Sequence, residues 1–161
     1  MKLPQHLLLL PLVLLASAGS AIAQVEKVAI RTTGISCGTC AFVSEFYLRR
    51  LAGVGAIKIS LTNEAILVSY KPGALFQPKE LREALKKTDV GVLEFQISAR
   101  GHIQERAGHR FLVAGKHTFA LAAEPGVAQV PSGTPVFIEA TLDDTVDPMQ
   151  LKVMTVKPID P

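Results

Sequence analysis

Apolar and polar residues alternate from Val25 to Thr32, with Val28 and Ile30 on one side of the segment. This period of two predicts a strand with one buried face. After a short loop the spacing becomes helical, and the apolar stripe of the next segment consists of Val43, Phe46, Tyr47 and Leu51. The spacing predicts a helix that buries this stripe and ends before Gly53 and Gly55.

Two further alternating segments, 56–61 and 64–70, are joined by Thr62-Asn63, which predicts a hairpin. Pro78 then occupies a favoured first-turn position of a second helix, whose apolar stripe is Leu81, Ala84 and Leu85. A strand-like run follows from Val90 to Ala99. The order is β-α-β-β-α-β, so residues 24–100 are expected to form an α+β, ferredoxin-like domain with two helices on one face of a four-stranded antiparallel sheet.

Beyond Gly101 the helical period disappears and short strand candidates recur between glycines. They lie around Ile103 and at 110–113, 118–121, 135–141 and 151–156. This pattern predicts a second unit over residues 101–161, a small all-β barrel or sandwich similar to an OB-like barrel. No linker separates the two units, and the segment 94–105 has the composition of one long strand that joins them.

The first 23 residues have the organisation of a cleavable secretory signal. Lys2 precedes an apolar run from Leu7 to Ala16, and Ala21-Ile22-Ala23 supplies the small residues of a cleavage site. A membrane-spanning helix would need about 20 apolar residues, and Pro11 interrupts this run. We therefore expect cleavage after Ala23, export across the inner membrane to the periplasm or beyond, and no stable membrane insertion afterwards.

The charge and composition argue against several classes of protein. The formal net charge is +3, and removal of Lys2 with the signal lowers it by one. The chain has no Trp and no basic run, so we expect no nucleic-acid partner. Two cysteines permit one disulfide at most, which excludes a disulfide-dense scaffold. No Ser/His/Asp set, phosphate loop or paired-carboxylate site is present, so we expect no catalytic residues, no bound organic cofactor and no enzymatic activity.

The chemistry of the chain is concentrated in Cys37 and Cys40, its two cysteines. Cys37 is expected in the loop after the first strand, and Cys40 in the first turn of the first helix. A helix amino terminus lowers the pKa of a thiol there, because free N–H groups and the helix dipole stabilise the thiolate. Two soft sulfur ligands are too few for a closed zinc site and suit a soft ion such as Cu(I) or Hg(II).

The segment Gly34-Ile35-Ser36-Cys37-Gly38-Thr39-Cys40 resembles the Gly-Met-x-Cys-x-x-Cys signature of the heavy-metal-associated family. The likeness extends over about residues 24–99, including Gly53-Val54 and the second helix at 80–85. The family includes copper chaperones, the periplasmic mercury-binding protein and modules of copper-transporting ATPases. The resemblance implies a ferredoxin-like fold, metal binding at Cys37 and Cys40, and a metal-donor or metal-acceptor partner such as a transporter. Copper(I) is the favoured ion, with mercury(II) or zinc as alternatives.

Two positions depart from the family pattern. The family's Met packs beneath the metal loop, and Ile35 is expected to fill that volume here. The loop after the second helix usually carries a Gly-aromatic pair or a Lys that offsets the thiolate charge. Here Lys86 and Lys87 precede that loop, and the sequence does not determine whether either reaches the cysteines. These departures bear on metal preference more than on fold.

Other interpretations remain open. In an oxidising compartment Cys37 and Cys40 would form a disulfide, and Cys-x-x-Cys at a helix start is also typical of thiol–disulfide redox proteins. A third possibility is an interaction module that keeps the fold without metal. The second unit carries further copper-type ligands: His102, His109, His117, Met149 and Met154. We interpret His109 and His117 as surface residues at strand ends, and the two methionines as packing or edge residues. A cluster of aspartates, Asp143, Asp144 and Asp147, is expected to form a solvated turn.

Overall fold

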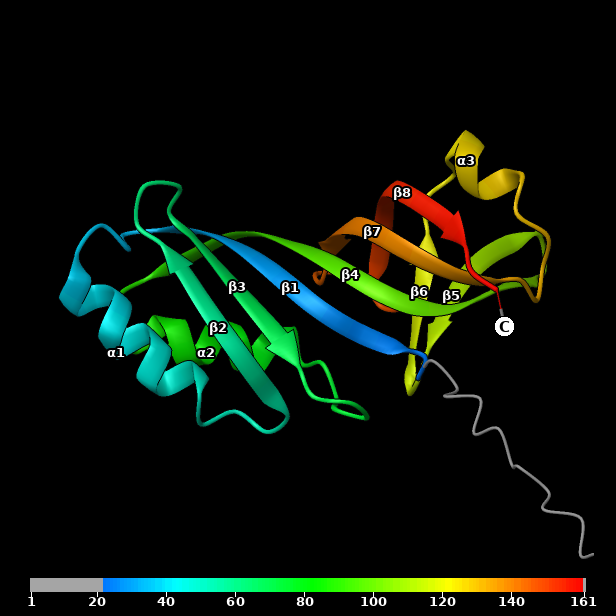
Figure 1. The fold of residues 1–161 in the computed structure, drawn as a ribbon. Helices are drawn as coiled ribbons and strands as arrows, with labels where there is room; N and C mark the ends of the chain where they lie inside the picture. Colours follow the sequence, from blue (N-terminus) through cyan, green and yellow to red (C-terminus); the bar gives the residue numbers. More distant parts are fainter. Residues whose placement is uncertain (1–21, 161) are drawn as a thin grey trace, which may run out of the picture.

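The computed structural model describes residues 22–160, so the predicted signal segment up to residue 21 lies outside the described residues. The described residues form one eight-stranded sheet with two main helices at one end (Figure 1). The elements, in chain order, are β1 (Gln24–Thr33), α1 (Gly38–Leu48), β2 (Val54–Ser60), β3 (Ala65–Tyr70), α2 (Pro78–Lys86), β4 (Gly91–Arg106), β5 (His109–Ala114), β6 (His117–Leu121), α3 (Pro125–Ala128), β7 (Pro135–Asp143) and β8 (Gln150–Pro158).

The amino-terminal elements have the predicted ferredoxin-like arrangement. Their strand order is β2-β3-β1-β4, and every neighbouring pair is antiparallel. In Figure 1, α1 and α2 lie side by side against one face of this sheet. The buried residues of α2 include Leu81, Ala84 and Leu85, as its sequence predicted.

The predicted buried stripe of α1 is wrong at Phe46, which is 46% exposed. The fully buried side chains of this helix are Ser44 and Leu48. Ser44 faces inward because its hydroxyl lies 3.0 Å from the Thr88 hydroxyl on the loop after α2. The buried face of α1 is therefore centred on Ser44 and Leu48 rather than on Phe46.

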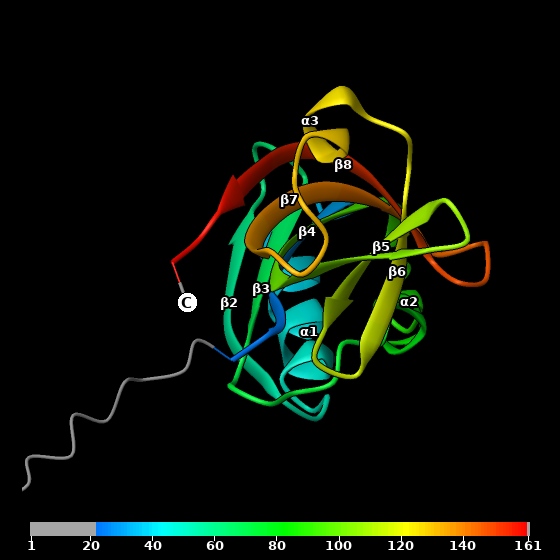
Figure 2. The same ribbon diagram turned by 90° about the vertical axis from the view of Figure 1, so that its right-hand side faces the viewer.

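The carboxy-terminal strands close a ring with β4. The pairings run β4-β5-β6-β8-β7, and β7 pairs again with β4. Figure 2, which faces this end, shows the strands curving around one another. Every predicted segment is a strand, but Ile103 belongs to β4 rather than to a strand of its own, and the short helix α3 was not predicted.

The strand β4 connects the two ends of the molecule. It runs unbroken from Gly91 to Arg106, across the predicted domain boundary at residues 100–101. Its residues 95–102 pair with β7, along the edge that the four-stranded sheet alone would leave open. The buried apolar residues of both ends form one core, from Ile30 and Leu48 to Phe119 and Leu151. The placement of a domain boundary at residues 100–101 stays a prediction.

Candidate metal site

The cysteine loop lies between the end of β1 and the start of α1, as expected. Gly34 has φ +86°, a left-handed conformation that favours glycine, and turns the chain out of the strand. Ile35 is fully buried beneath the loop, which confirms that it fills core volume at this position. The loop is therefore fixed at its base while Ser36 and Cys37 remain exposed.

Cys37 is the N-cap residue of α1, with extended backbone dihedrals of −132° and 154°. The Cys40 N–H donates to the Cys37 Sγ across 3.1 Å. The two sulfur atoms are joined as a disulfide, and the two Cα atoms lie 5.2 Å apart. Both sulfurs therefore meet at the amino terminus of α1, the helix end where N–H groups favour negative charge.

The loop between α2 and β4 packs against the cysteine loop and against α1. A Cβ placed on Gly34 would lie 3.2 Å from the Asp89 carbonyl oxygen, so the two backbones are closely packed. The Thr88 hydroxyl donates to the Leu85 carbonyl and contacts Ser44 on α1. The sequence did not mark Ser44, Thr88 or Asp89; the available signal was a serine inside an otherwise apolar helical face.

The Lys87 ammonium lies 5.4 Å from the centre of the Tyr47 ring, and both residues line a hollow between α1 and α2. No acidic residue occupies the first turn of α1, so no carboxylate of that turn opposes a thiolate. Beside Cys40, the Phe42 ring is 72% exposed.

The other candidate ligands are not brought to the cysteines. Within residues 22–160, no three His, Cys, Asp or Glu side chains are gathered as a metal cluster. The His102 ring contacts Gln104, and His109 is exposed at the start of β5. His117 is half-buried and accepts from the Phe76 N–H, which corrects the expectation of a surface histidine.

The aspartate turn is also more than a solvated turn. Asp144 receives two 2.8 Å hydrogen bonds from the Arg82 guanidinium on α2. This ion pair raises the pKa of Arg82 above its ordinary value, chiefly through the hydrogen bond. Asp143 instead accepts from the backbone N–H and hydroxyl of Thr145, and these bonds lower the pKa of its carboxyl.

Among the helices of the described residues, none is long and apolar enough to cross a membrane.

Comparison with known proteins gives partial matches. No protein-family model matches the chain. Copper-transporting ATPase 2 of mouse is 39% identical over 64 residues, and the match covers 40% of this chain and 4% of that protein. The human protein of the same name is 38% identical over 61 residues. The chain thus spans a small fraction of the relatives that it matches.

Two solved structures are also similar to part of the chain. The CopZ metallochaperone shares 22% identity at a TM-score of 0.39, over 42% of this chain and 98% of that one. The yeast copper transporter domain Ccc2a shares 24% identity at a TM-score of 0.36, over 42% of this chain and 94% of that one.

The match to copper-transporting ATPase 2 over 64 residues agrees with the resemblance to the heavy-metal-associated family.

Proposed function

We propose that this protein binds one soft metal ion, with copper(I) as the favoured ion, through the thiolates of Cys37 and Cys40. The observation that carries the proposal is the meeting of both sulfurs at the exposed amino terminus of α1. Thiolates are soft ligands and select soft ions such as Cu(I). The names of the similar proteins, a copper-transporting ATPase and a metallochaperone, support copper over mercury(II) or zinc.

The disulfide must be reduced before metal can bind. A dithiol reductant breaks the Cys37–Cys40 bond and supplies two electrons and two protons, and is itself oxidised to a disulfide. The two thiols then lose their protons as the ion binds. The helix amino terminus favours this step because it stabilises the negative charge that forms on the sulfurs.

The site is also suited to passing its ion to a partner. Cys37 is exposed and Cys40 is half-exposed, so an incoming thiolate can reach the ion and replace the two ligands in turn. We therefore propose a metal-donor or metal-acceptor protein, such as a metal transporter, as the partner. The proposal includes export by the signal segment and activity in the periplasm or outside the cell.

Anaerobic titration of the reduced protein with Cu(I) tests metal binding. Wild-type protein is expected to bind one equivalent, followed by thiolate-to-copper absorption. Cys37→Ser and Cys40→Ser should each lose stoichiometric binding, whereas Ser36→Ala, at the exposed neighbouring position, should keep it. The proposal fails if the reduced wild-type protein binds no copper.

The exported location has its own test. The amino-terminal sequence of protein recovered from the periplasm or medium should begin at Gln24. Recovery of uncleaved protein in the cytoplasm would contradict export while leaving metal binding untouched.

The disulfide itself favours a second candidate, an exported thiol–disulfide redox protein. Reduced protein would then reduce insulin catalytically, with loss of activity in Cys37→Ser. A protein that neither reduces insulin nor binds copper would be an interaction module.

For the carboxy-terminal ring, we infer an OB-like barrel, because five strands close on one another and α3 lies between β6 and β7 in the chain.

A further inference from the structure

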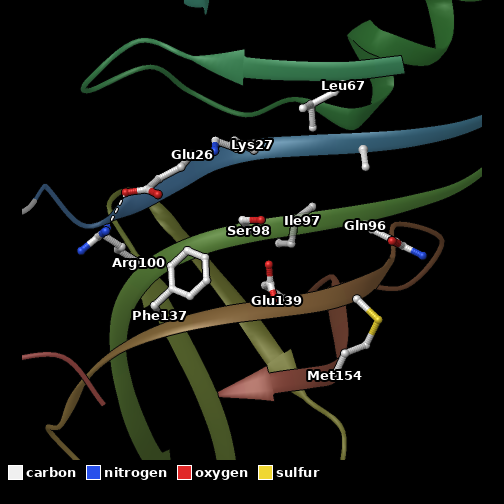
Figure 3. Close-up of a pocket in the computed structure, with 11 residues that line it drawn as sticks. Glu26, Lys27, Leu67, Gln96, Ile97, Ser98, Arg100, Phe137, Glu139 and Met154 are labelled. Carbon is white, nitrogen blue, oxygen red and sulfur yellow. Dashed lines mark hydrogen bonds and ion pairs between the residues drawn. The ribbon is translucent and has the colours of Figure 1, made fainter. Parts of the chain in front are cut away.

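The face of the sheet that the helices leave uncovered carries a groove of about 600 Å³ (Figure 3). Arg82 of α2 lies over the Phe95 ring, so Phe95 points to the helix side and the alternating Gln96, Ser98 and Arg100 point to the opposite side. The lining residues come from β1, β3 and β4 together with β7 and β8. The groove therefore depends on the joining of the four-stranded sheet to the β7–β8 hairpin.

The register of the strands puts a cation, a hydroxyl and a carboxylate in one row across the groove. Lys27 of β1 is opposite Ser98 of β4, and Ser98 is opposite Glu139 of β7. Neighbouring strands lie about 4.8 Å apart, so the backbones at Lys27 and Glu139 are about 10 Å apart. In Figure 3 the Glu139 side chain rises from β7 toward Ser98.

Among the charged residues of the groove, one cation and one carboxylate form an ion pair with each other, and another cation and carboxylate do not. The Arg100 Nε donates to the Glu26 Oε1 across 2.6 Å, and the same guanidinium lies 5.8 Å from the centre of the Phe137 ring. Lys27 and Glu139 take part in none of the ion pairs found within residues 22–160. The groove thus offers a ligand one cation and one carboxylate, at opposite ends of the row.

We propose that this groove binds a short zwitterionic peptide, whose carboxylate pairs with Lys27 and whose ammonium pairs with Glu139. Two or three residues of extended chain, at about 3.5 Å per residue, match the distance of about 10 Å between the strands that carry Lys27 and Glu139. A polyanion would be opposed by Glu26 and Glu139, and a polycation by Lys27 and Arg100. A protein tail presents only one terminus, so a free peptide satisfies both ends.

Apolar surface completes the site for the side chains of the peptide. The Met154 side chain is 54% exposed and reaches into the groove from β8. Phe137 and Leu67 flank the charged row, and the Ser98 hydroxyl is available to the peptide backbone between the two ends. Lys27 lies six residues before Thr33, about 20 Å along β1, so this site is separate from the cysteine loop.

Titration of isotope-labelled protein with the tripeptide alanyl-leucyl-alanine, followed by amide chemical shifts, tests the proposal. Saturable shifts are expected in β1, β4 and β7, with binding at least about 5-fold weaker for the N-acetylated and C-amidated peptides. Lys27→Gln and Glu139→Gln should weaken binding by a similar factor. Lys58→Gln and Glu83→Gln, at exposed positions outside the groove, should leave it within about 2-fold.

Charge reversal gives a stricter test. Lys27→Glu and Glu139→Lys should each abolish binding, whereas the double variant should regain it because the peptide binds in the opposite direction. The amide spectra report whether each variant is folded. The proposal is overturned if the free tripeptide produces no saturable shifts, if blocked peptides bind equally well, or if a folded double variant does not regain binding.

Discussion

The cysteine loop and the junction between the two ends of the molecule are held in different ways. The loop is fixed at its base, by Ile35 and the Ser44–Thr88 contact, and it leaves Cys37 exposed and Cys40 half-exposed. The junction is held by continuous strand pairing along β4 and by side chains such as Arg82 and His117. The two cysteines can react only if a metal ion or a partner can reach them. The junction instead covers the edge of β4, which would otherwise be open to pairing with other chains.

The largest expected difference between the two regions comes from a single added methyl group. At Gly101, in the middle of β4, a Cβ would collide with the Val113 carbonyl oxygen and lie 2.9 Å from its carbonyl carbon. Because the obstacle is the backbone of a paired strand, Gly101→Ala should lower the free energy of unfolding by about 3 kcal/mol. Urea denaturation followed by circular dichroism measures the change.

The matched substitution in the cysteine loop is Gly38→Ala. Apart from its chain neighbours and the backbone of its own helix, no atom of residues 22–160 lies within 4 Å of the position of its Cβ. Gly38 is the first residue of α1, so alanine should alter stability by no more than about 0.5 kcal/mol. Equal effects of the two substitutions would contradict the contrast between a packed junction and an open loop.

Ion pairs provide a smaller test of the same contrast. Asp144 has a side chain only 12% exposed and accepts two hydrogen bonds from the Arg82 guanidinium across the junction. Asp144→Asn should lower the free energy of unfolding by about 1 to 2 kcal/mol, because the half-exposed Arg82 guanidinium loses a charge-assisted partner. Glu45→Gln removes the exposed Glu45–Arg49 pair on α1 and should cost about 0.5 kcal/mol or less.

A double-mutant cycle with Arg82→Gln separates the pair from its surroundings. The coupling energy between Asp144 and Arg82 should exceed that between Glu45 and Arg49. A junction pair no stronger than the helix-surface pair would show that strand pairing alone holds the two ends together.

The local elements of the fold were predictable because each depends on a short apolar period. The stripe Leu81, Ala84 and Leu85 and the alternation of β1 needed no partner to be recognised. The face of α1 was mispredicted because Ser44 is buried by a hydroxyl contact with Thr88, 44 residues away.

Long-range pairing was not predictable from single segments. The β4–β7 register, which sets Ser98 opposite Glu139, joins strands about forty residues apart and follows no turn rule. The partners of the Arg82–Asp144 pair are further apart still, at 62 residues. The placement of Cys37 and Cys40 was predictable, because the loop and the helix start are adjacent in the chain, whereas the row of Lys27, Ser98 and Glu139 was not.

The smallest expected effect is a pH dependence confined to the junction. The His117 Nε2 accepts from the Phe76 N–H, so this nitrogen carries no proton in the folded protein. Burial lowers the pKa of His117 below its ordinary value of 6.5. The unfolded chain therefore binds more protons than the folded chain, and stability should be complete above pH 7 and decline as the pH falls through 6.5 toward the lowered pKa.

Urea denaturation at a series of pH values measures this dependence, and His117→Gln should flatten the decline because glutamine does not titrate. His109→Gln, at the exposed start of β5, should leave the decline as it is in the wild type. If the His109 variant flattened the curve and the His117 variant did not, the acid sensitivity would lie outside the junction, and the Phe76–His117 contact would not be a part of what holds the two ends together.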